Sequence, residues 1–169
     1  LRLSREFDFP ILEDECYADL LWNSKRPIAL AAMDNGNRVI HCGSFSKTIA
    51  PALRVGYLVA DWHLLSQILA VKNDSGTGAL EQMMLAEYCV NHFDDHVNKL
   101  SSTLKDKLET LVEAVKVYFG TSAEFEVPEG GIFLWISLPE HVDTIRLSQL
   151  AAKEGIAINP GPEWSTDTK

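Results

Sequence analysis

The chain has 169 residues, of which 46% are hydrophobic and 23% are charged, and its net charge is −9 at pH 7. This composition is typical of a folded globular protein. The acidic balance argues against a nucleic-acid-binding surface in this segment, because such surfaces carry a basic stripe. No apolar run is long enough to span a bilayer and no signal peptide is recognisable, so neither a membrane span nor export is predicted. The three scattered cysteines favour a reducing, cytoplasmic location over a disulfide framework.

The first half of the chain alternates short apolar segments with polar connections. Segments rich in β-branched residues predict strands at 38–42 and 55–60. A third, short strand is predicted at 9–14, which is entered through Pro10 and ends in carboxylates. Residues 20–37 are predicted to be mostly loop. Asp61 is the expected N-cap of a helix, which the polar, glycine-containing segment 73–78 ends.

The second half is dominated by helical periodicity. The expected elements in chain order are helices at 79–91 and 94–119, a hairpin at 125–139, a helix at 142–154 and a strand at 156–158. This order predicts an α/β unit followed by a smaller α+β unit. We expect the division near residue 100, which gives a first part of residues 1–100 and a second of residues 101–169.

Lys47 lies in the stretch 43–56, Gly-Ser-Phe-Ser-Lys-Thr-Ile-Ala-Pro-Ala-Leu-Arg-Val-Gly, between two predicted strands. An amine held in a turn between strands can form an imine with an aldehyde. The hydroxyls of Ser44 and Ser46 and the guanidinium of Arg54 make a candidate phosphate seat, because the planar fork of arginine donates two hydrogen bonds to a phosphate. Ser46 has an alternative reading, in which it only supports the turn. The segment indicates a phosphorylated aldehyde cofactor bound through lysine.

Asp14 ends the first predicted strand, and Tyr17 follows three residues later. A strand that ends in a carboxylate places it at the sheet edge where α/β proteins bind ligands. A carboxylate beside a pyridine nitrogen keeps that nitrogen protonated, so that the ring accepts electrons. A nearby phenol can donate a hydrogen bond to the ring oxygen. Helix capping is the structural alternative for Asp14, and simple packing is the alternative for Tyr17.

Taken together, these residues resemble the class I/II aminotransferases of fold type I, which use pyridoxal 5′-phosphate. The sequences of residues 13–20 and 43–47 are similar to those of the aminoadipate-aminotransferase-like and MocR-type branch. The resemblance implies that Lys47 is the Schiff-base lysine and that Asp14 pairs with the pyridine nitrogen. It further implies that Tyr17 contacts the ring oxygen and that three residues hold the phosphate: Ser44, Ser46 and Arg54.

The resemblance also implies the architecture and partners. The chain would contain an incomplete large-domain sheet followed by a smaller α+β C-terminal domain, and the active protein would be a homodimer. Its substrates would be an amino acid and a 2-oxo acid. The Gly130-Gly131-x-Phe133-x-Trp135 hairpin would flank the substrate site. From residue type, Phe133 and Trp135 are expected mainly to fill the small-domain core, with substrate contact from one face only. The family's arginine for the substrate carboxylate has no counterpart here, and Arg146 is not assigned that role.

Two other functions remain open at this stage. In MocR-type regulators an aminotransferase-like domain follows a winged-helix domain, so DNA would be bound through a segment preceding Leu1. A related enzyme of the same fold could instead catalyse β-elimination, decarboxylation or condensation. His92 and His96 have the spacing of a helical metal pair, but no third ligand is evident; we interpret them as a solvated helix junction and predict no metal site.

Overall fold

The computed structural model describes residues 1–22, 25–35 and 37–166. The chain divides into two compact units. The first comprises Leu1–Glu109 together with Pro128–Phe133, and the second comprises Thr110–Val127 together with Leu134–Lys169. The long helix α4 (Ala79–Phe119) contains the division between them.

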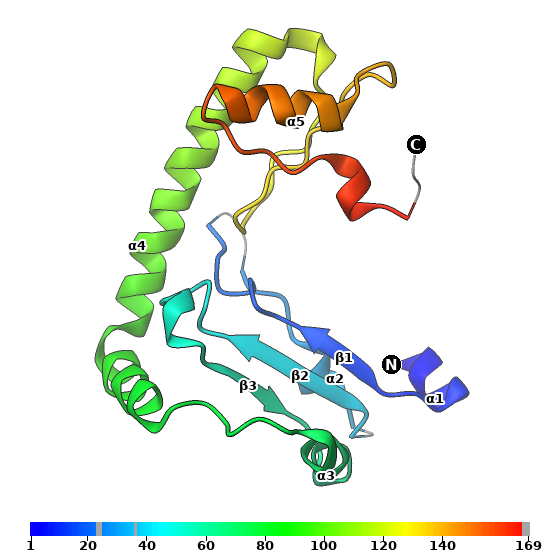
Figure 1. The fold of residues 1–169 in the computed structure, drawn as a ribbon. Helices are drawn as coiled ribbons and strands as arrows, with labels where there is room; N and C mark the ends of the chain where they lie inside the picture. Colours follow the sequence, from blue (N-terminus) through cyan, green and yellow to red (C-terminus); the bar gives the residue numbers. More distant parts are fainter. Residues whose placement is uncertain (23–24, 36, 167–169) are drawn as a thin grey trace. The chain divides into compact units, whose positions relative to one another are not determined.

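A three-stranded sheet forms the centre of the first unit (Figure 1), in the order β1-β2-β3. β1 (Ile11–Asp14) and β2 (Val39–Ser44) are parallel, whereas β3 (Gly56–Val59) is antiparallel to β2. All three predicted strands are therefore confirmed. Because β1 and β2 run in the same direction, the turns that follow them leave the sheet at the same edge.

Among the described residues, three α-helices precede α4 in the first unit. They are α1 (Arg2–Phe7), α2 (Leu30–Met33) and α3 (Trp62–Val71). Asp61 caps α3 as expected, since its side chain accepts a hydrogen bond from the His63 N–H at 2.9 Å. The short helix α2 was not predicted. Its first turn depends on Glu13 of β1, whose carboxylate accepts hydrogen bonds from the Leu30 and Ala31 N–H groups.

The second unit is built from the C-terminal part of α4 and two later elements, α5 (Thr144–Lys153) and η3 (Gly161–Trp164). A further short helix, η2 (Gly120–Ser122), begins at a glycine with φ 55°, which confirms the predicted end of the long helix. Val112, Val115 and Ala123 are buried in this unit.

Three predictions of secondary structure were wrong. A single continuous helix replaces the two expected at 79–91 and 94–119, because the polar junction between them contains neither glycine nor proline. The expected hairpin at 125–139 is reduced to one antiparallel bridge, between Glu124 and Ser137. Residues 156–158 are not a strand, because within the described chain no neighbouring strand pairs with them.

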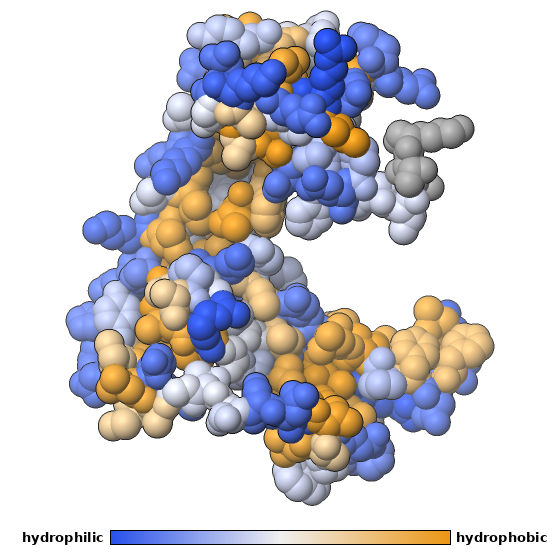
Figure 2. All heavy atoms as spheres, viewed as in Figure 1, coloured by the Kyte–Doolittle hydropathy of each residue, from blue (hydrophilic) through white to orange (hydrophobic). Residues whose placement is uncertain are grey.

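Large apolar side chains remain exposed on several elements. Figure 2 shows apolar residues at the surface along α4 and over the sheet-bearing part of the first unit. Met83 and Val90 of α4 are 71% and 82% exposed. Within the described residues, no helix is long and apolar enough to cross a membrane.

Candidate functional site

Lys47 lies in a turn that directly follows β2. The turn is closed by the carbonyl of Phe45, which accepts hydrogen bonds from the N–H groups of Ile49 and Ala50 at 2.9 and 3.0 Å. At its base the Phe45 N–H donates to the carbonyl of Val55 at 3.1 Å. The Lys47 side chain is exposed, so its amine is accessible to a ligand.

Tyr17 lies in the turn that follows the parallel neighbour, β1. The Nζ atom of Lys47 is 5.8 Å from the centre of the Tyr17 ring, within the range of a cation–π contact. The common direction of β1 and β2 explains this proximity, because it brings both turns to one sheet edge. The structure therefore brings together two residues that the sequence singled out separately.

Phe133 packs edge-on against the Tyr17 ring, with the two ring centres 6.0 Å apart. The expectation that Phe133 and Trp135 fill a small-domain core is wrong: their exposed fractions are 59% and 62%. Phe133 instead belongs to the first compact unit. Only the assignment of its side chain to the core is contradicted; the expectation that the Gly130-Gly131 segment flanks the substrate site stays a prediction.

Those glycines explain how the Phe133 segment is held. Gly130 forms an antiparallel bridge with Leu21, and the Gly131 N–H donates to the carbonyl of Leu20 at 2.7 Å. A Cβ atom on Gly130 would stand only 2.4 Å from that Leu20 carbonyl oxygen, and Gly131 has φ +84°. Only glycine permits both this approach and this backbone conformation.

Asp14 ends β1 with an exposed carboxylate. The Cys16 N–H donates to its Oδ1 atom at 3.1 Å. Hydrogen bonds from the Cys16 thiol and then from the Cys16 backbone lower the pKa of Asp14, because they stabilise the ionised form. These hydrogen bonds therefore favour the ionised carboxylate of Asp14.

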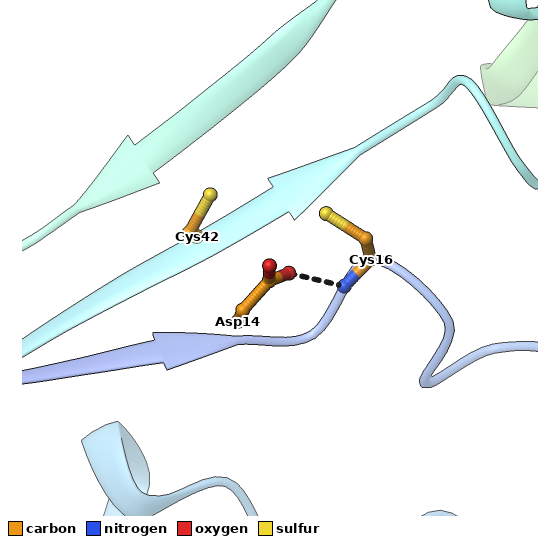
Figure 3. A group of neighbouring side chains, drawn as sticks. All are labelled: Asp14, Cys16 and Cys42. Atoms are coloured by element: carbon orange, nitrogen blue, oxygen red, sulfur yellow. Dashed lines mark hydrogen bonds between the residues drawn. The ribbon is translucent and has the colours of Figure 1, made fainter. Parts of the chain in front are cut away.

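Two thiols lie beside this carboxylate (Figure 3). Cys42 is the register partner of Asp14 in the parallel ladder, and Cys16 follows two residues after Asp14. The hydrogen bond to Asp14 and then burial raise the pKa of the Cys16 thiol to about 11. Both cysteines are free and half-buried.

The three predicted phosphate ligands lie together on a cavity of about 570 Å³, which Cys16 and Cys42 also line. Ser44 ends β2, and its Oγ atom accepts a hydrogen bond from the Ser46 N–H at 3.1 Å. Arg54 has φ 54°, which turns the chain between η1 (Pro51–Leu53) and β3. Asp14, Tyr17 and Lys47 are not part of the cavity lining, so the six candidates form two adjoining groups rather than one enclosed pocket.

The opposite face of the β1–β2 pair carries a separate polar network. Glu13 is the register partner of His41, whose Nδ1 atom lies 3.3 Å from the Glu13 carboxylate. Burial tends to raise the pKa of Glu13, but hydrogen bonds from Leu30, Ala31 and His41 outweigh it and lower the pKa. This network joins β1 to α2 and to β2 through the Glu13 carboxylate.

The aminotransferase class I and II family model matches residues 1–168. The HTH-type transcriptional regulator NorG of Staphylococcus aureus is 38% identical over 98% of this chain, which spans 38% of the regulator. The multiple substrate aminotransferase of Thermococcus profundus is 32% identical with a TM-score of 0.85, over 95% of this chain and 40% of that enzyme. LysN, the α-aminoadipate aminotransferase of Thermus thermophilus, solved with N-(5′-phosphopyridoxyl)-L-leucine, is 26% identical with a TM-score of 0.87, over 95% and 43% of the two chains.

These matches agree with the fold and with the resemblance drawn from the Lys47 segment. The chain spans about two fifths of the length of the relatives it matches. It belongs to the aminotransferase class I and II family.

Proposed function

We propose that this chain carries the cofactor-binding part of a pyridoxal-phosphate-dependent aminotransferase, which moves an amino group from an amino acid to a 2-oxo acid. The observation that carries the proposal is the placement of the Lys47 amine 5.8 Å from the Tyr17 ring centre. This placement brings the Lys47 amine, which is a nucleophile, close to the turn that follows Asp14, at the sheet edge where α/β proteins bind ligands.

The donor set fits pyridoxal phosphate. Ser44, Ser46 and Arg54 line one cavity and offer two hydroxyls and a guanidinium for a phosphate. Asp14, whose pKa is lowered by its hydrogen bonds, offers an anion for the ring nitrogen. When bound, the cofactor supplies an aldehyde for amines and a ring that accepts electrons.

The residues of this chain then have separate tasks. Lys47 would hold the cofactor through its amine and would serve as the base at the α-carbon of the amino acid. Tyr17, whose ring packs edge-on against Phe133, would offer its hydroxyl to the ring oxygen. Arg54 and the two serines would hold the phosphate and so orient the cofactor toward Lys47.

A transaminase assay on the full-length protein tests this function. The protein is incubated with pyridoxal phosphate, 2-oxoglutarate and a panel of amino acids, and the amino products are measured by chromatography. We expect transfer from at least one amino acid, and the same preparation of Lys47→Ala gives none. Cofactor binding without transfer from any amino acid contradicts the enzymatic proposal.

The similarity to NorG favours a second candidate, an effector domain of a MocR-type transcriptional regulator. In that case the same Lys47 and Asp14 would bind the cofactor, while DNA would be bound by a winged-helix domain outside this segment. The negative charge of this segment suits that arrangement, since it leaves phosphate contacts to another domain. A gel-shift assay of the full-length protein with its own upstream DNA, with and without pyridoxal phosphate, distinguishes the two.

We further propose a cytoplasmic homodimer. The exposed apolar residues of α4, among them Met83 and Val90, offer a surface that a second copy can cover, and three free cysteines suit a reducing compartment. Sedimentation velocity of the full-length protein tests the dimer.

We also propose a division into a large-domain part, residues 1–100, and a small-domain part, residues 101–169. The two compact units divide the same helix after Glu109.

A further inference from the structure

Asp14, Cys16 and Cys42 converge on one face of the β1–β2 pair (Figure 3). Their ligand atoms, one carboxylate oxygen and two thiol sulfurs, all lie within 4.8 Å of one another. Two features of the backbone cause this convergence. Asp14 and Cys42 are register partners in the parallel ladder, and Cys16, two residues after Asp14, returns to the same face.

The ladder continues one step past β1 and holds the cluster in place. The Glu15 N–H donates to the carbonyl of Cys42 at 2.9 Å, which fixes the backbone between Asp14 and Cys16. The Cys16 N–H then orients the Asp14 carboxylate from 3.1 Å. Cys16 and Cys42 also line the cavity of about 570 Å³, so a small ion can reach the sulfurs from outside.

Two thiols and a carboxylate make a donor set that selects a thiophilic cation. Sulfur ligands favour Zn²⁺, whereas Mg²⁺ and Ca²⁺ prefer oxygen alone. Around Zn²⁺, with bonds of about 2.0–2.3 Å, tetrahedral ligands stand roughly 3.5 Å apart. The separations, which are all within 4.8 Å, would therefore contract by at most about 1.3 Å on metal binding.

We propose that Asp14, Cys16 and Cys42 bind Zn²⁺ as three protein ligands, and that bound Zn²⁺ excludes the pyridine ring of the cofactor. On binding, each thiol releases its proton to solvent, and the metal takes the place of the proton that Cys16 shares with Asp14. The fourth position stays open to water. The exclusion rests on the proposed function, in which the same Asp14 carboxylate pairs with the ring nitrogen.

The competition follows from charge. Asp14 is the carboxylate proposed for the ring nitrogen, and Zn²⁺ at the cluster would neutralise it and occupy its oxygen. A protonated pyridine and a divalent cation cannot share that position, since they repel each other. The cluster would thus make cofactor loading sensitive to zinc.

The metal arm of the test uses Co²⁺ as a spectroscopic probe for Zn²⁺. Reduced, metal-free, full-length protein is titrated with cobalt chloride, and the thiolate-to-cobalt charge-transfer band is recorded. We expect the band in the parent protein and in Cys89→Ser, which changes a half-buried free cysteine lining a different cavity. We expect its loss in Cys42→Ser. Absence of the band in folded parent protein, or its persistence in Cys42→Ser, overturns the metal site.

The cofactor arm uses protein loaded with Zn²⁺ and dialysed before pyridoxal phosphate is added. In the parent protein and in Cys89→Ser, we expect zinc to raise the apparent Kd of the cofactor at least about tenfold over the zinc-free protein. In Cys42→Ser, we expect the same Kd with and without zinc. An unchanged Kd in zinc-loaded parent protein overturns the exclusion. Cofactor binding to chelator-treated protein is measured in parallel. If this metal-free protein binds no cofactor, the result counts against the proposed function. The cobalt band does not depend on cofactor binding and still tests the metal site.

Discussion

The amine of Lys47 lies 5.8 Å from the centre of the Tyr17 ring, although the two residues belong to turns that follow different strands. The parallel pairing of β1 and β2 produces this relationship by sending both turns to one edge of the sheet. Asp14, the last residue of β1, lies at the same edge. The proposed chemistry depends on this shared edge, because it brings the Lys47 amine to the turn that follows Asp14.

Tyr17→Phe removes the hydroxyl but keeps the ring against Lys47 and Phe133. A phenol that donates to the ring oxygen of the cofactor stabilises negative charge there and lowers the proton affinity of the lysine–cofactor bond. We therefore expect the pH midpoint of the bound cofactor's absorbance to rise by on the order of one unit in Tyr17→Phe. Tyr88→Phe, whose hydroxyl contacts His96 on α4, is the control and leaves the midpoint unchanged. Equal midpoints in Tyr17→Phe and the parent would remove Tyr17 from the proposed site.

Asp14→Asn removes the anion proposed for the ring nitrogen. Because the pKa of Asp14 is lowered, its charge is fully present above the ordinary pKa of an aspartate and is lost only as the pH falls through the lowered value. The parent protein is expected to keep its cofactor from neutral into mildly acidic solution. The turnover of Asp14→Asn is expected to be roughly 10²-fold lower than that of the parent at every pH in this range. Turnover against pH measures this. Glu6→Gln, which changes an exposed carboxylate paired with Arg2, is the matched control.

Arg54→Gly removes the guanidinium from the phosphate seat and keeps a residue that tolerates φ 54°. Charge-assisted hydrogen bonds contribute about 1.5–3 kcal/mol, so the Kd of pyridoxal phosphate is expected to increase roughly 10- to 100-fold. Arg54→Lys keeps the charge without the planar fork, so its Kd for pyridoxal phosphate should lie between those of the parent and Arg54→Gly. Equilibrium dialysis gives the constants. Parent-like binding by Arg54→Gly would show that the phosphate is held elsewhere.

Gly43→Ala tests the packing beneath the Lys47 turn. A Cβ atom at this position would stand 2.2 Å from the Tyr57 ring, so the ring or the strand must move. We expect a loss of roughly 1–3 kcal/mol in unfolding free energy, measured by urea denaturation of the full-length protein. Gly161→Ala, where no atom lies within 4 Å of the new Cβ, serves as the neutral comparison. Combining Gly43→Ala with Tyr57→Leu should recover part of the loss; equal stability of the two alanine variants would contradict the clash.

Features set by local sequence were predictable. Short apolar segments between polar connections predicted β1, β2 and β3, and Asp61 predicted the start of α3, because strand and cap preferences act within a few residues. The continuity of α4 was missed because polar residues at its middle were read as a break, although such residues lower helix propensity only slightly.

Features set by contacts between distant segments were not predictable. The helix α2 depends on Glu13 of β1, and the position of Phe133 depends on the pairing of Gly130 with Leu21. The convergence of Asp14 with Cys42 depends on a one-residue choice of register, which no short motif encodes. The residues of the candidate site were therefore identifiable as types, while their grouping into two adjoining sets required the structure.

The most direct test of the account is the location of the covalent bond to the cofactor. Full-length protein is incubated with pyridoxal phosphate, reduced with sodium borohydride, digested and analysed by mass spectrometry. The account predicts a phosphopyridoxyl group on Lys47, absent in Lys47→Arg and unaffected in Lys105→Arg, whose amine pairs with Glu109 on the exposed face of α4. A modified lysine other than Lys47, or no modified peptide in folded protein, would contradict it.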